Sequence, residues 1–212
     1  MGGVPNGPAP GGKPLRLLQA VPSKVYNRLI VRHPYKTDGD YAFFYHEAAN
    51  RLASTYTGEP IDDTILIPFL MLYRQAFELK LKNFIRYLAG IRLRYDESAN
   101  SELDPKTIDE KLRKELGHNL AKLLNELLKH YASLDLPEGF PESVKKLVWM
   151  MHDADKHGTA FRYARQMPES QDSADFPDLV EMLDKEFRLL SAGEDWIDAI
   201  YSAAPDPEDF YY

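Results

Sequence analysis

The stretch FLMLYRQAFELKLKNFIRYLAGIRLRY, residues 69–95, decides the fold. It contains no proline and no glycine before Gly90, so nothing in its first twenty-one residues removes a backbone hydrogen bond or favours a turn. Asp62 and Asp63 precede it and can cap its first turn, and Pro68 is expected to kink that end. The sequence therefore predicts one long, kinked helix around which the other elements pack.

Beyond this helix, more helices are predicted from residues that favour helix starts and from apolar residues at helical spacing. The pattern is clearest between residues 120 and 128, where leucines recur at i, i+3, i+4, i+7 and i+8. Gly117 is expected to break the chain just before this helix, and Gly193 to separate a short last helix from its predecessor. The other predicted starts lie at Pro105, Pro141 and Pro177.

The N-terminal side differs in composition. Residues 1–14, MGGVPNGPAPGGKP, are nearly all glycine, proline and small residues, and we predict that they are disordered. Residues 15–39 are predicted to form an extended arm or a short strand. Behind Asp40, the residues at helical spacing are Phe44, Ala48, Leu52 and Thr55, which predicts a first helix over residues 40–56.

The fold class that follows is an all-α bundle of five to seven helices, with residues 40–204 as a single domain and residues 205–212 as an acidic aromatic tail. The net charge of −7 excludes a protein that coats DNA generally. The absence of cysteine excludes disulfides, thiolate catalysis and zinc fingers, and fits the cytoplasm. The longest apolar run, residues 65–73, is too short to span a membrane, so no membrane association is expected.

One interpretation of the histidines is an HD-type metal-dependent phosphohydrolase. In such enzymes a histidine, an adjacent His-Asp pair and a distant aspartate bind metal ions that activate water. The sequence offers His118, then His152 and Asp153, then either Asp184 or Asp195, in that order. Adjacent side chains on a helix differ by about 100° in direction, so His152 and Asp153 could share a metal only where their helix frays.

A second interpretation is metal-free RNA cleavage by an arginine and a histidine a few residues apart, the histidine handling the 2′-hydroxyl proton and the arginine holding the phosphate. Two windows have this spacing, from Arg28 to His33 and from Arg113 to His118. The second straddles the predicted break at Gly117, which could let the two side chains act together. The structural alternative for His118 is a helix-start residue whose ring bonds a neighbouring backbone group or carboxylate.

Three blocks in fixed order carry a resemblance to a known family. They are YRQAFELKLKNF at 73–84, LGHNLAKLLNEL at 116–127 and DKHGTAFRYA at 155–164. Together they resemble a prokaryotic HEPN-like family of helical proteins, which does not need His152. The chain departs from the family pattern at Gln75, where histidine is common, and at Gly158, where serine is common.

The resemblance implies a homodimeric, HEPN-like component of a prokaryotic defence or stress-response system that acts on or binds RNA or a nucleotide phosphate. Such a protein could be a metal-independent ribonuclease with no cofactor, or a non-catalytic scaffold or regulatory subunit for a protein encoded nearby. The candidate catalytic residues are His118 and Arg113. The candidate binding residues are Arg74, Glu78, Asp155, Arg162 and Tyr163.

Spacing adds a physical expectation about these candidates. Arg74, Glu78 and Lys82 follow one another at i, i+4 and i+8, so they line one stripe of the long helix. We expect Arg74 and Glu78 to face His118 and Arg162 across the bundle in a polar pocket, and the head of Asp155 to converge on the same pocket. The alternative is a ladder of ion pairs within the helix, with Arg162 simply pairing with Asp155.

Overall fold

The computed structural model describes residues 37–95, 99–163 and 173–202. Within these residues there are six α-helices and no strand, which confirms the predicted all-α bundle. The predictions for the disordered lead-in, for nearly all of the arm and for the tail fall outside the described residues. No helix in the described part of the chain is both long and apolar enough to cross a bilayer.

Helix α1 spans Asp38–Ala53 and begins two residues before the predicted start. Thr37 caps it, because the Thr37 side chain accepts a hydrogen bond from the Asp40 backbone while the Asp40 carboxylate accepts one from the Thr37 backbone. On the side that the sequence suggested as the apolar face, Phe44, Ala48 and Thr55 are exposed, and Leu52 alone packs partly against the core. The buried residues are instead Ala42, His46 and Ala49.

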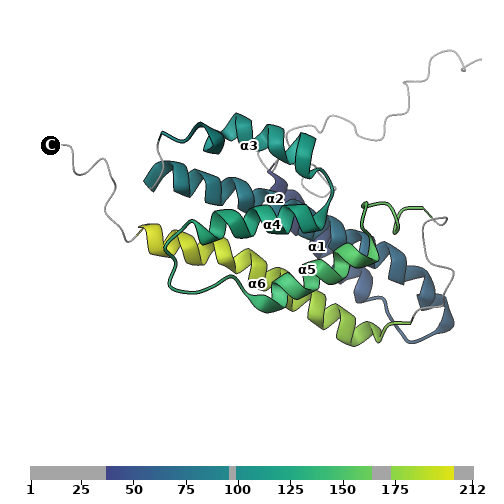
Figure 1. The fold of residues 1–212 in the computed structure, drawn as a ribbon. Helices are drawn as coiled ribbons and strands as arrows, with labels where there is room; N and C mark the ends of the chain where they lie inside the picture. Colours follow the sequence, from purple (N-terminus) through teal and green to yellow (C-terminus); the bar gives the residue numbers. More distant parts are fainter. Residues whose placement is uncertain (1–36, 96–98, 164–172, 203–212) are drawn as a thin grey trace, which may run out of the picture. The chain divides into compact units, whose positions relative to one another are not determined.

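Helix α2, Asp63–Tyr95, is the predicted long helix and follows the 3₁₀ turn Pro60–Asp62, with Pro68 inside its first turns. It contacts α1, α3, α4 and α6, and Figure 1 shows it running the length of the bundle. Its inward side is a continuous row of fully buried apolar residues at helical spacing. They are Phe69, Tyr73, Phe77, Leu81, Phe84 and Leu88.

The chain returns through the 3₁₀ turn Ser101–Leu103 and α3, Pro105–Lys111, which continues into a π-helical turn, Leu112–Leu116. Gly117 ends that turn with φ +54°, a conformation that favours glycine, so the predicted break is confirmed. Helix α4, Leu120–Ala132, then starts at a cap in which the Asn119 side chain accepts a hydrogen bond from the Lys122 backbone.

Helix α5, Glu142–Ala154, packs on α4 and on α6, Phe176–Ser202. The prediction that Gly193 separates two helices is wrong, because α6 runs through it without interruption. A Cβ atom on Gly193 would lie 3.1 Å from two ring atoms of Phe84. Glycine is therefore used here to let α6 approach α2 closely, and local sequence alone cannot distinguish this use from a helix end.

Candidate functional site

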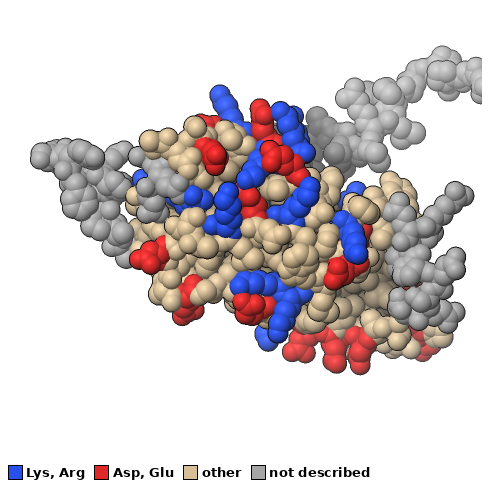
Figure 2. Space-filling view, in the orientation of Figure 1, with Lys and Arg blue, Asp and Glu red and all other residues tan. Residues whose placement is uncertain are grey.

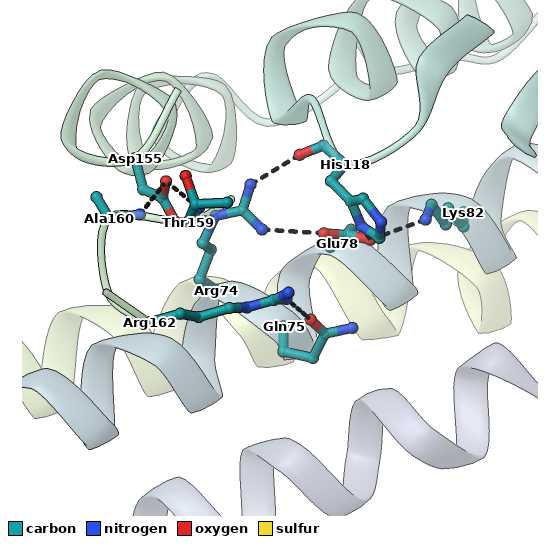
Figure 3. Close-up of polar contacts among 9 residues, drawn as sticks. All are labelled: Arg74, Gln75, Glu78, Lys82, His118, Asp155, Thr159, Ala160 and Arg162. Atoms are coloured by element: carbon teal, nitrogen blue, oxygen red, sulfur yellow. Dashed lines mark hydrogen bonds and ion pairs between the residues drawn. The ribbon is translucent and has the colours of Figure 1, made fainter. Parts of the chain in front are cut away.

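Arg74 is the centre of a polar cluster inside the bundle (Figure 3). Its guanidinium donates to Glu78 Oε2 at 2.9 Å and to the backbone oxygen of His118 at 2.7 Å, and its Nε lies 2.9 Å from Asp155 Oδ2. One side chain on α2 thus joins the turn before α4 to the turn after α5. We call Arg74, Glu78, Lys82, His118 and Asp155 the Arg74 cluster.

Each buried charge in this cluster has a partner of opposite charge, although the contact between Arg74 Nε and Asp155 Oδ2 is an ion pair without hydrogen-bond geometry. Moving a charged group out of water costs several kcal/mol unless partners replace the lost hydration. The Glu78 carboxylate also accepts from Lys82 Nζ at 2.8 Å, and Asp155 Oδ1 accepts from the backbone of Thr159 at 2.8 Å and of Ala160 at 3.0 Å. The charges inside the cluster therefore balance one another, and the two atoms left without a hydrogen bond are Arg74 Nε and Asp155 Oδ2.

Glu78 remains ionised in this setting. Burial raises the pKa of its carboxyl, but the hydrogen bonds and positive charges of Lys82 and His118 lower it further than burial raises it. The net pKa lies below the ordinary value of 4.5. Glu78 therefore presents a fixed negative charge to its neighbours at neutral pH.

His118 is the member of the cluster that reaches the surface, with 62% of its side chain exposed. Its Nδ1 lies 2.7 Å from Glu78 Oε1. An ionised carboxylate only accepts hydrogen bonds, so the proton of the neutral ring belongs on Nδ1. Nε2 then carries the free lone pair, and no hydrogen bond to it occurs among the described residues. A buried carboxylate that orients an exposed imidazole is suited to acid–base chemistry.

The other candidate residues lie outside this network. Arg162 is exposed and donates to Gln75 Oε1 at 3.2 Å, so it contacts the position where the family commonly has histidine. Tyr163 and Arg113 are exposed and make no side-chain hydrogen bond to His118 in the described structure. Asp155 pairs with Arg74 and not with Arg162, unlike the structural alternative suggested by the sequence.

Gly158 lets the turn after α5 close over Arg74. It has φ +75°, and a Cβ atom there would lie 2.9 Å from Arg74 Nη2. The turn after α5 therefore closes directly over the guanidinium only because this residue has no side chain. A side chain at this position would displace Arg74 or the turn.

The residues of the HD interpretation do not assemble. No group of three or more histidine, aspartate or glutamate side chains in the described part of the chain could hold a metal ion. His152 packs edge-on against Trp149, with ring centroids 5.7 Å apart, and burial lowers its pKa. Asp184 is bonded to His46 and Arg188.

A second polar cluster was missed in the sequence. His46 Nε2 lies 2.7 Å from Asp184 Oδ1, Asn50 donates to the same oxygen at 2.9 Å, and Tyr73 donates to Asn50 Oδ1 at 2.6 Å. The His46 ring stacks on Phe187 at a centroid distance of 4.4 Å. The one available signal was the i, i+4 spacing of His46 and Asn50 within the predicted first helix.

Comparison with known proteins adds no assignment. No protein-family model, curated protein sequence or solved structure matches the chain. The resemblance of the three blocks to HEPN-like proteins is therefore still a prediction. The geometry of the Arg74 cluster is the observation on which a function can be argued.

Proposed function

We propose that the chain is an HEPN-like protein of a prokaryotic defence or stress-response system, located in the cytoplasm, that binds RNA or a nucleotide phosphate at His118 and cleaves RNA without a metal ion. The observation that carries this proposal is the exposed His118 ring held at Nδ1 by the buried Glu78 carboxylate, 2.7 Å away. The same contact also fits the structural alternative, in which the ring only bonds a carboxylate, and the proposal differs from it in giving the free Nε2 a chemical role.

The proposed chemistry uses this free nitrogen. Nε2 takes the proton from a ribose 2′-hydroxyl as its oxygen attacks the adjacent phosphorus, and the bond from phosphorus to the 5′-oxygen breaks. The products are a 2′,3′-cyclic phosphate and a 5′-hydroxyl whose proton comes from solvent. Glu78 stabilises the imidazolium that forms, and Arg74 and Lys82 keep Glu78 in place.

Local charge supports a phosphate ligand. Residues 105–132 contain six lysines and arginines against four acidic residues, although the whole chain has a net charge of −7. Figure 2 shows blue basic side chains over α3 and α4, with red acidic side chains among them. The positive end of the α4 dipole lies beside His118, because α4 begins at Leu120. Exposed Arg113 and Arg162 are the candidate phosphate contacts.

The test is binding and cleavage of a fluorescein-labelled single-stranded RNA with a metal chelator present. We expect cleavage that survives the chelator and falls by about 100-fold or more in His118→Ala with helicity unchanged. His157→Ala is the matched control, since His157 is the other exposed histidine of the described residues, and it should retain full activity. Cleavage that the chelator abolishes, or full activity of His118→Ala, would contradict the proposal.

A second candidate function is a non-catalytic dimeric scaffold or regulatory subunit. The observation that favours it is the aromatic surface of α1, where the side chains of Phe43 and Phe44 are exposed by 55% and 45% beside the exposed Tyr41. We expect a dimer mass by light scattering and loss of the dimer in Phe43→Ser/Phe44→Ser. The scaffold function predicts that this double variant loses biological activity while His118→Ala keeps it.

A further inference from the structure

A groove of about 500 Å³ lies between the end of α1 and the start of α6. Its walls include Asn50 and Ala53 from α1 and Val180, Glu181 and Asp184 from α6. None of its lining residues belongs to the Arg74 cluster. The volume falls within the range typical of ligand sites, so the groove is a candidate for a second binding site.

The groove has an aromatic side. Tyr56 and Phe176 line it with ring centroids 5.0 Å apart, and Phe176 is fixed from behind by Phe69 at 4.9 Å. Tyr56 is partly exposed, so one face of its ring is available to a ligand. An exposed tyrosine ring attracts both apolar groups and cations.

The acidic residues that line the groove are Glu181 and Asp184. The first part of α6 and the residue before it carry a carboxylate at every third position: Asp175, Asp178, Glu181 and Asp184. Figure 2 shows acidic side chains in a row along this part of α6. Glu181 is exposed and makes no hydrogen bond or ion pair within the described structure, so its charge is free to pair with a bound cation.

Asp184 is held rigidly at the inner end of the groove. It accepts hydrogen bonds from His46, Asn50 and Arg188 at 2.7, 2.9 and 2.7 Å. Burial raises the pKa of its carboxyl, but these hydrogen bonds and the charge of Arg188 outweigh burial, so the pKa lies below its ordinary value of 3.8. A fixed, ionised carboxylate loses little freedom when a ligand binds.

We propose that this groove recognises a basic segment of a partner protein in which arginine or lysine alternates with apolar residues. The cation would pair with Glu181 and lie near Tyr56, while the apolar neighbours would cover Ala53 and Val180. The acidic residues that line the groove repel nucleic-acid phosphate and acidic peptides. The groove thus serves a partner of opposite charge to the phosphate ligand proposed at His118, and it does not depend on that site.

The probe for this proposal is a fluorescein-labelled peptide of alternating arginine and valine. The control is the same peptide with glutamate in place of each arginine. Fluorescence anisotropy with the full chain should show saturable binding of the basic peptide only. We expect about tenfold weaker binding in Glu181→Lys and in Val180→Trp, which fills the groove. Tyr56→Ala should also weaken binding, whereas Tyr56→Phe and the matched control Asp195→Lys, on α6 outside the groove, should change it less than about twofold.

The proposal is overturned if Asp195→Lys weakens binding as much as Glu181→Lys, or if both peptides bind alike, because either result indicates only general charge attraction. Unchanged binding in Val180→Trp overturns it too, and Ser54→Trp replaces that variant if it does not fold. If the variant that fills the groove changes the oligomeric mass of the protein in the absence of peptide, the groove is a contact between two copies of the chain. That result also overturns the proposal. His118→Ala should leave peptide binding unchanged, which separates this test from that of the proposed function.

Discussion

Two histidine–carboxylate pairs in this molecule have the same nitrogen–oxygen distance but differ in which partner is buried. The shortest nitrogen–oxygen distance is 2.7 Å both for His118 and Glu78 and for His46 and Asp184. In the first pair the histidine is 62% exposed and the carboxylate 1% exposed. In the second pair the histidine is 4% exposed and the carboxylate 27% exposed. The two pairs therefore share a short distance and differ in which partner faces water: the histidine in the first pair and the carboxylate in the second.

The two histidine rings also differ in whether a ligand can reach them. The His46 ring is stacked on Phe187 and buried between α1 and α6, so no substrate can reach it. It serves to hold Asp184 and to join the two helices. His118 leaves one nitrogen at the surface, and the charges behind Glu78 come from Arg74 and Lys82, which support the pair without covering it.

The largest loss of stability is expected on substitution of Arg74, which holds Glu78 beneath the exposed His118. Arg74→Met leaves Glu78 and Asp155 buried with one partner fewer each, and breaking buried ion pairs in this way costs about 3–5 kcal/mol. We expect a loss of that size in the free energy of unfolding, measured with urea. Arg162→Met, at an exposed arginine, should change it by less than about 0.5 kcal/mol. Equal effects of the two variants would show that the cluster does not join the bundle.

The next largest effect is the difference in stability between the alanine variants of the two histidines. His46→Ala removes a buried ring, its stacking and a bond to Asp184, and should cost about 2–4 kcal/mol. His118→Ala removes an exposed ring and leaves Glu78 paired with Arg74 and Lys82, so it should cost less than about 1 kcal/mol. Thermal unfolding of both variants measures the difference. A larger loss in His118→Ala would reverse the roles assigned to the two pairs.

A smaller effect is expected at the turn over Arg74. Gly158→Ser places a side chain at φ +75° and a Cβ atom 2.9 Å from the guanidinium, and should cost about 1–2 kcal/mol. Gly90→Ala is the contrast, because nothing lies within 4 Å of the added Cβ in this helix, and should stabilise the protein by about 0.5–1 kcal/mol. A stabilising Gly158→Ser would show that the turn does not close on Arg74.

The smallest effect concerns acid pH. Glu78 has a lower pKa in the folded protein than its ordinary value of 4.5, so its contribution to stability is complete above about pH 4.5 and is lost as the pH falls through the folded pKa. Urea unfolding at a series of pH values should show this decline, and Glu78→Gln should make the slope shallower. A slope that Glu78→Gln leaves unchanged would contradict this contribution of Glu78.

Much of the fold could be predicted because local signals determine it. The long α2 follows from a stretch without helix-breaking residues, and the break before α4 follows from Gly117. Two predictions failed because the deciding contact is distant. Gly193 packs on Phe84, more than a hundred residues away, and the inward side of α1 is set by His46, whose partner Asp184 lies 138 residues along the chain.

The candidate site was predictable in part for the same reason. The three sequence blocks led to the expectation that Arg74, Glu78, His118, Asp155 and Arg162 converge. The first four meet, whereas Arg162 is exposed and donates to Gln75. The sequence does not indicate that three of these four would be buried and mutually paired while His118 is exposed. That division depends on how α4 and the turn after α5 cover α2, and periodicity within single helices does not predict it.

Whether Glu78 orients the His118 ring is tested most directly by the tautomer of that ring. The tautomer is read from the ¹⁵N chemical shifts of the imidazole at a pH where the ring is neutral. If buried Glu78 orients the ring through Nδ1, the proton will be on Nδ1 and Nε2 will have the shift of a free nitrogen, and Glu78→Gln will relax this preference. A proton on Nε2 in the unaltered protein, or a tautomer that does not respond to Glu78→Gln, would show that Glu78 does not orient the ring.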